Sequence, residues 1–170
     1  MDWSDEKLQS VLESFEEHRI HLLQFMKAIR DLKDEYGITP DPELGTAVVG
    51  CFGRHTEGRD LMSCLLISNG FNVVSSKRDE SIEDIVGRCV DPTVTVLCLS
   101  VQTTYDCPDL YSVSGMLEES GVRDRIILNI GGAPITKQMA DKMCCDVYGG
   151  TAAESVRAIK EAVLRMRKKS

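Results

Sequence analysis

The pattern of apolar and polar residues changes near position 46. Before it, residues 4–36 contain no Gly or Pro and carry apolar side chains at a seven-residue spacing in two columns: Leu8, Phe15, Leu22, Ile29 and Tyr36, and Val11, Phe25 and Leu32 with the polar His18 between them. Alternating steps of three and four residues are typical of a coiled-coil seam or of a helix in a bundle. We therefore expect one long amphipathic helix in an N-terminal segment, residues 1–38, whose apolar face packs on a second copy of the chain or on the main domain.

From residue 46, short β-branched runs alternate with helical patterns. The runs are 46–52, 71–76, 93–100, 125–130 and 145–148, and their starts lie 20 to 32 residues apart. Repeated βαβ units of this length form a parallel sheet with right-handed crossovers and helices on both faces. The fold class expected for residues 46–170 is α/β: a flavodoxin-like (Rossmann-like) doubly wound, five-stranded parallel sheet in the order 2-1-3-4-5, preceded by the long N-terminal helix.

Composition narrows the class of protein. The 170 residues are 42% hydrophobic and 28% charged, as in an ordinary globular domain. No apolar run approaches the ~18 residues of a membrane span, and the acidic start is unlike a secretory signal, so we expect a cytoplasmic protein with no membrane partner. The formal charge of -7 comes without a basic face, which disfavours nucleic acid as a partner. The seven cysteines include no C-x-x-C pair, so neither a disulfide framework nor a zinc finger is indicated.

Candidate chemistry lies at the carboxyl ends of the predicted strands. In a doubly wound sheet the ligand crevice opens where the strand order reverses, beyond the first and third strands. That places the loop 53–58 beside the loop 100–104, with Gly131-Gly132 and Gly149-Gly150 at the same edge. The sequence has no G-x-G-x-x-G, no P-loop and no G-x-S-x-G, which disfavours nucleotide-binding and hydrolase sites. For either glycine pair alone, an ordinary turn is the competing interpretation.

Three short motifs occupy these loops: Gly53-x-His55-x-x-Gly58, Ser100-Val101-Gln102 and Gly131-Gly132. Together they resemble the cobalamin-binding (corrinoid) domain of methionine synthase, of methanogenic and acetogenic corrinoid proteins and of carbon-skeleton mutases. That family has D-x-H-x-x-G, S-x-L and a Gly pair in these places, and the resemblance covers about residues 46–165. The chain differs at two positions, because Gly53 replaces the family's Asp and Gln102 replaces its apolar residue.

The resemblance implies a cobalamin (corrinoid) cofactor. Its cobalt would be coordinated by His55, which would replace the cofactor's own base as the lower axial ligand, and the displaced nucleotide tail would enter the sheet. No catalytic residue is expected. The predicted cofactor-binding residues are Arg54, Thr56, Glu57, Gly58, Ser100, Val101, Gln102, Thr104, Gly131, Gly132, Tyr148, Gly149 and Gly150.

The function implied by the resemblance is that of a methyl-carrier subunit rather than a complete enzyme. It would present His-ligated cobalt to separate methyltransferase partner proteins, and the N-terminal helix would form a homodimer. Three alternatives stay open: a sensor domain that responds to cobalamin or haem, a scaffold that has lost its cofactor, and a mutase small subunit.

Overall fold

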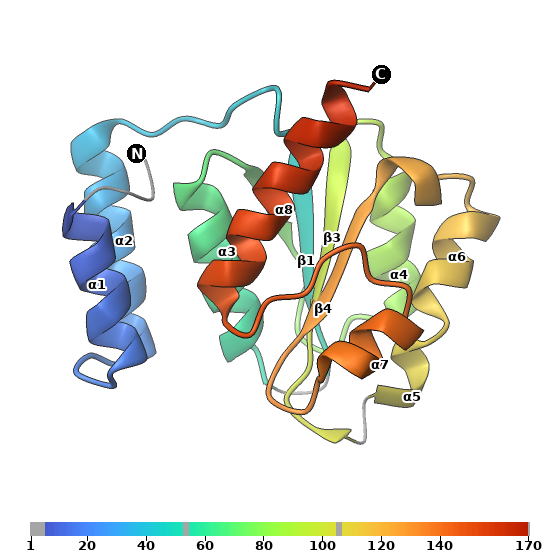
Figure 1. Ribbon diagram of the computed structural model, residues 1–170, viewed down its shortest axis with the longest axis horizontal. Coiled ribbons are helices and arrows are strands. Elements are labelled where there is room, and N and C mark those ends of the chain that lie inside the picture. Colours follow the sequence, from blue (N-terminus) through green and yellow to red (C-terminus); the bar gives the residue numbers. More distant parts are fainter. Residues whose placement is uncertain (1–5, 53–54, 105–106, 170) are drawn as a thin grey trace.

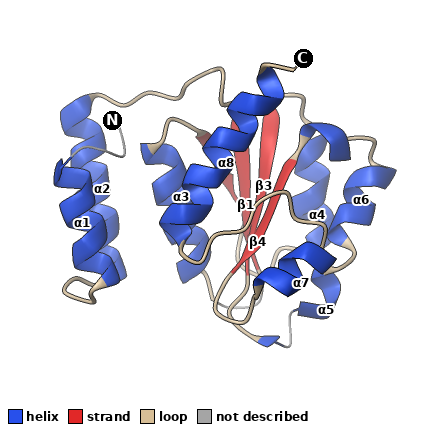
Figure 2. Ribbon diagram, viewed as in Figure 1, coloured by secondary structure: helices blue, strands red, loops and turns tan. Residues whose placement is uncertain are grey.

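A four-stranded parallel sheet forms the centre of the molecule (Figure 2). The computed structural model describes residues 6–52, 55–104 and 107–169. The strands are β1 (Thr46–Cys51), β2 (Asn72–Ser75), β3 (Val94–Ser100) and β4 (Ile127–Gly131), in the order β2-β1-β3-β4. Every residue of β1 and β3 is buried, as expected for central parallel strands rich in Val.

Helices cover both faces of the sheet (Figure 1). Because successive side chains of a strand point to opposite faces, Val49 of β1 packs in one buried cluster and Val48 in the other. The first face is covered by α3 (Glu57–Ser68) and α8 (Ala152–Arg167). The second face and the connections hold α4 (Ile82–Gly87), η1 (Arg88–Val90), α5 (Cys107–Leu110), α6 (Val113–Glu119), η3 (Arg123–Arg125) and α7 (Lys137–Lys142). The α/β fold with a parallel sheet is therefore confirmed.

The predicted fifth strand, residues 145–148, is reduced to one parallel bridge between Asn129 and Val147. The Asp146 carboxylate explains this. Its Oδ2 accepts a hydrogen bond from the Leu128 backbone N–H at 2.7 Å and from Arg123 at 2.9 Å. A side chain thus takes a β4 donor that a neighbouring strand would otherwise use. Within the described residues the sheet has four strands, so the predicted count of five is corrected and the full order 2-1-3-4-5 is not confirmed.

The N-terminal segment is a hairpin of two helices, α1 (Glu6–Glu16) and α2 (Leu22–Tyr36), so the prediction of one long helix is wrong. The chain turns at His18, which has a φ of 57°, in the left-handed region. The apolar residues of α1 then pack against those of α2, and the rings of Phe15 and Phe25 have a centroid distance of 4.6 Å. Leu8, Leu12, Phe25, Ile29 and Leu32 are buried, and α2 packs on α3 (Figure 1).

The apolar face of this hairpin belongs to the same buried cluster as Leu65 and Leu66 of α3. The hairpin therefore buries much of its apolar face within one chain, although Leu23 and Tyr36 stay exposed. The division into segments 1–38 and 46–170 stays a prediction. Across the described residues, no helix combines the length and the apolar character that crossing a bilayer requires.

Candidate functional site

A cleft of about 410 Å³ opens between the ends of β3 and β4 and the first turns of α3 and α8. We call it the strand-end cleft. The fold forms it because β3 and β4 run parallel and end at the same edge, while α3 and α8 begin there. It is lined by Gly58, Leu61, Met62, Leu99, Ser100, Gln102, Asn129, Gly131, Gly132, Ala133, Ile135, Tyr148, Gly149, Gly150, Thr151, Ala152 and Ser155.

Eight of the predicted cofactor-binding residues line this cleft: Gly58, Ser100, Gln102, Gly131, Gly132, Tyr148, Gly149 and Gly150. Val101 is fully buried and is not part of the lining. Thr56, Glu57 and Thr104 are described but are not part of the lining. Arg54, like Gly53, lies outside the described residues. The structure thus brings together loops from four separate parts of the sequence and, of the charged predicted residues that it describes, leaves Glu57 out of the lining.

Two neighbouring glycines at the end of β4 have different roles. Gly132 has a φ of 127°, and a Cβ there would lie 1.8 Å from the Val101 carbonyl oxygen. Only glycine allows this loop to approach the end of β3 so closely. A Cβ on Gly131 would have nothing within 4 Å, although Gly131 lines the cleft. Gly132 therefore allows this loop to pack tightly against the Val101 backbone. The absence of a side chain at Gly131 leaves space open in the cleft.

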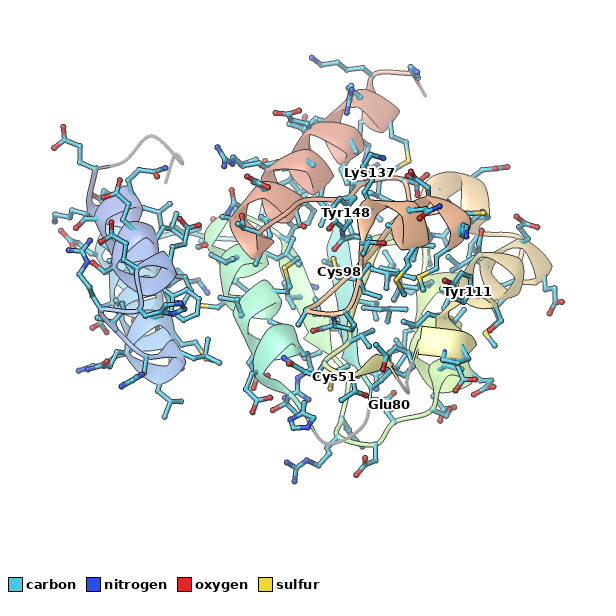
Figure 3. All side chains as sticks on the ribbon, turned by 60° about the horizontal axis from the view of Figure 1, so that its bottom comes forward. Cys51, Glu80, Cys98, Tyr111, Lys137 and Tyr148 are labelled. Atoms are coloured by element: carbon cyan, nitrogen blue, oxygen red, sulfur yellow. The ribbon has the colours of Figure 1, made fainter. Side chains whose placement is uncertain are left out.

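The polar atoms of the cleft belong to hydroxyl and amide groups. Ser100, Asn129 and Ser155 are all buried. The Asn129 amide donates to the Val147 carbonyl at 3.2 Å, which leaves its side-chain oxygen as an acceptor. Tyr148, labelled in Figure 3, donates from its hydroxyl to the Ile135 carbonyl at 3.2 Å. These groups offer hydrogen bonds without a formal charge, so they can orient the polar atoms of a ligand.

His55 lies in the loop between β1 and α3, and its side chain is 57% exposed. Its Nδ1 is 3.9 Å from a carboxylate oxygen of Glu57. In the part of the chain that the structure describes, no group of three His, Cys, Asp or Glu side chains could hold a metal. An imidazole here could thus supply one ligand to a metal whose other ligands come from a cofactor.

Two thiols of the sheet region, Cys98 and Cys145, are poor metal ligands. Burial raises the pKa of the Cys145 thiol to about 11. Burial also raises the pKa of Cys98, which lies on β3 in the centre of the molecule (Figure 3). Both thiols stay protonated at neutral pH, and it is the thiolate that binds a metal.

Sequence reasoning missed part of the lining: Leu61, Met62, Leu99, Asn129, Ala133, Ile135, Thr151, Ala152 and Ser155. In the sequence pattern, the apolar residues among them look like ordinary core positions of a helix or strand. Asn129 was detectable, because an amide inside the apolar run 125–130 needs hydrogen-bond partners once it is buried. Ser155 had no comparable signal, since a serine early in a helix is common.

The chain is similar to several known proteins, although no protein-family model matches it. It is 32% identical over 136 residues to trimethylamine corrinoid protein 2 of Methanosarcina mazei, covering 74% of this chain and 62% of that protein. It is also 32% identical over 138 residues to dimethylamine corrinoid protein 3 of the same organism, covering 80% of this chain and 81% of that protein. The chain belongs to the corrinoid protein family. The chain spans less than two thirds of the length of the trimethylamine relative, but most of the length of the dimethylamine relative.

Solved structures agree with the fold of this corrinoid protein. A cobalamin-binding protein from Desulfitobacterium hafniense matches with a TM-score of 0.73 at 18% identity, over 89% of this chain and 75% of that one. The methanol:cobalamin methyltransferase complex MtaBC from Methanosarcina barkeri matches with a TM-score of 0.68 at 22% identity, over 94% of this chain and 66% of that one. At these identities the matches establish the fold alone.

Proposed function

We propose that this protein is a corrinoid-binding methyl carrier. The observation that carries the proposal is the strand-end cleft in a member of the corrinoid protein family. Its described lining contains several glycines and no charged side chain, and helix α3, which lines it, comes directly after the loop that carries His55. When bound, cobalamin would supply a cobalt centre that accepts and releases a methyl group. The relatives do not favour the sensor, scaffold and mutase alternatives.

The residues present fit such a cofactor. Gly131 leaves space in the cleft, and the buried Ser100, Asn129 and Ser155 can exchange hydrogen bonds with a ligand there. We propose that these residues hold the displaced nucleotide tail, and that His55 at the exposed rim is the lower axial ligand. The predicted roles of Thr56, Thr104 and Arg54 stay predictions.

Glu57 is the candidate to orient the His55 ring. In the family an Asp has this role, and its position is Gly53 here, which has no side chain. The Glu57 carboxylate is 3.9 Å from Nδ1, so a small rotation would let it accept a hydrogen bond from that N–H. A metal-bound histidine usually has such a partner, whose loss typically costs ~10–100-fold in affinity or activity.

Separate methyltransferases are the proposed protein partners. The name of the similar complex from Methanosarcina barkeri describes an assembly with a methyltransferase. A homodimer through the N-terminal helix stays a prediction, and a large part of the apolar seam that motivated it packs within one chain. A cytoplasmic location also stays a prediction.

The test is to mix the full chain with hydroxocobalamin and record the visible spectrum and the bound fraction. We expect the spectrum of histidine-ligated cobalt with the cofactor's own base displaced. His55→Ala should lose that spectrum, whereas His21→Asn should keep it, because Asn also caps helices well at this N-cap position. No binding, or identical spectra from wild type and His55→Ala, would contradict the proposal.

A further inference from the structure

A second cleft lies between the N-terminal hairpin and the α/β part of the molecule, with a volume of about 300 Å³. We call it the hairpin cleft. Its wall on one side is α2, which packs beside α3 (Figure 1). The volume is at the lower end of the range for small-molecule pockets, roughly 300–1,000 Å³. The lining residues are Met26, Ile29, Arg30, Lys33, Asp60, Ser63, Cys64, Ile67 and Ser75.

Two cations of α2 line the hairpin cleft without a carboxylate partner. Among the described residues, neither Arg30 nor Lys33 belongs to an ion pair. The one carboxylate in the lining, Asp60, already accepts two hydrogen bonds from the Arg59 guanidinium, at 2.8 and 2.6 Å. The lining therefore holds two cations against one carboxylate, and that carboxylate is already paired with Arg59. Both cations act electrostatically on Cys64, which places their charge at the cleft.

The remaining walls are apolar or neutral. Ile29 is buried, and Met26, Ile67 and Cys64 are partly buried. The hydroxyls of Ser63 and Ser75 hydrogen-bond to each other at 2.9 Å, so they need no ligand. An inorganic anion would leave these apolar walls without contacts. A small organic anion would use both features, since its charge would meet the cations and its hydrocarbon part would cover the walls.

The hairpin cleft is separate from the strand-end cleft. Helix α3 lies between them, presenting Leu61 and Met62 to the strand-end cleft and Ser63, Cys64 and Ile67 to the hairpin cleft. The proposed corrinoid function uses only the first of these faces. The charge and the apolar walls of the second have no role in it.

We propose that the hairpin cleft binds a small organic carboxylate, with the acid group on Arg30 and Lys33 and the hydrocarbon part against Met26, Ile29 and Ile67. The guanidinium of Arg30 can bind a carboxylate through two parallel hydrogen bonds. The inference does not depend on the corrinoid proposal, because it rests on different residues.

Benzoate is a suitable probe, with benzamide as its uncharged counterpart and inorganic phosphate as an anion without hydrocarbon. The full chain, carrying isotopically labelled methionine methyl groups, is titrated with each probe by NMR. Met26 lines the hairpin cleft, Met62 lines the strand-end cleft, and Met139 lies on α7 and packs against the core of the second sheet face. We expect benzoate to shift the Met26 signal only. Benzamide should bind about tenfold more weakly, the loss expected for one charge-assisted hydrogen bond.

Two variants complete the test. Arg30→Gln with Lys33→Gln should weaken benzoate binding by tenfold or more, and Lys27→Gln, on the same helix but outside the lining, should leave it unchanged. Three results would overturn the proposal: no shift at Met26 with benzoate, a shift at Met62 instead, or equal binding of benzoate and benzamide. Phosphate binding as tight as that of benzoate would also overturn it, because the apolar walls would then contribute nothing.

Discussion

The two clefts on opposite faces of α3 differ in how they can recognise a ligand. Among the described residues, the strand-end cleft has no charged side chain in its lining and is formed by glycines, buried hydroxyls and amides. The hairpin cleft has two cations without carboxylate partners above apolar walls. The first can select by shape and hydrogen bonds, and the second by charge. Helix α3 thus separates two clefts of different chemistry, because the residues on its two faces line different clefts.

The largest expected effect concerns the glycines that shape the strand-end cleft. Gly132→Ala should lower the free energy of unfolding by about 3 kcal/mol, because its Cβ would overlap the Val101 backbone and its φ is unfavourable for L-residues. Gly131→Ala, one residue away, should change it by less than about 1 kcal/mol, since its Cβ meets open space. Urea unfolding of the two variants measures the difference. Equal losses would mean that the two glycines do not have the separate roles assigned to them.

A second change would fill the strand-end cleft without disturbing the hairpin cleft. Gly131→Val should keep the fold and weaken cobalamin binding by about tenfold or more, because overpacking of this size typically costs 1–3 kcal/mol. Benzoate binding in the hairpin cleft should stay unchanged in the same variant. Equilibrium dialysis with cobalamin and the Met26 NMR signal report the two sites. Unaltered cobalamin affinity would exclude the strand-end cleft as the tail site.

A smaller effect concerns Cys64 in the hairpin cleft. Burial raises the pKa of this thiol from 9.0 to about 11, although Arg30 and Lys33 oppose the shift. Between these values the unfolded chain has released the proton and the folded chain has kept it, so stability falls as the pH rises from about 9 towards 11. Cys64→Ala should make the fall less steep, by up to about 1 kcal/mol per pH unit near pH 10. Urea unfolding at several pH values tests this, and parallel curves for both proteins would contradict it.

Much of the fold could be predicted from the sequence, because burial of whole strands leaves a simple pattern. The Val-rich runs at β1 and β3 identified the centre of the sheet, and the glycines at the end of β4 identified the edge where the strand-end cleft opens. The chemistry of single side chains was harder to foresee. The Asp146 carboxylate binds a β4 backbone N–H, so residues 145–148 form a bridge rather than a strand, and nothing in their β-branched pattern reveals this.

The N-terminal hairpin was misread for a different reason. Its seven-residue spacing continues through the turn, and no Gly or Pro interrupts residues 4–36. The break is made by His18 in the left-handed region, a conformation that sequence rarely signals for a non-glycine residue. The hairpin cleft could not be predicted for the same reason, since it exists only where α2 packs beside α3.

The central claim is that the His55 imidazole coordinates cobalt. The most direct measurement is electron paramagnetic resonance of the protein-bound cofactor in its cobalt(II) form, with histidine labelled by the heavier nitrogen isotope. Coordination by His55 predicts that the triplet splitting from the axial nitrogen becomes a doublet on labelling, and that the His55→Ala variant shows no such change. A triplet that persists in the labelled wild-type protein would contradict the account, because the axial nitrogen would then come from the cofactor itself.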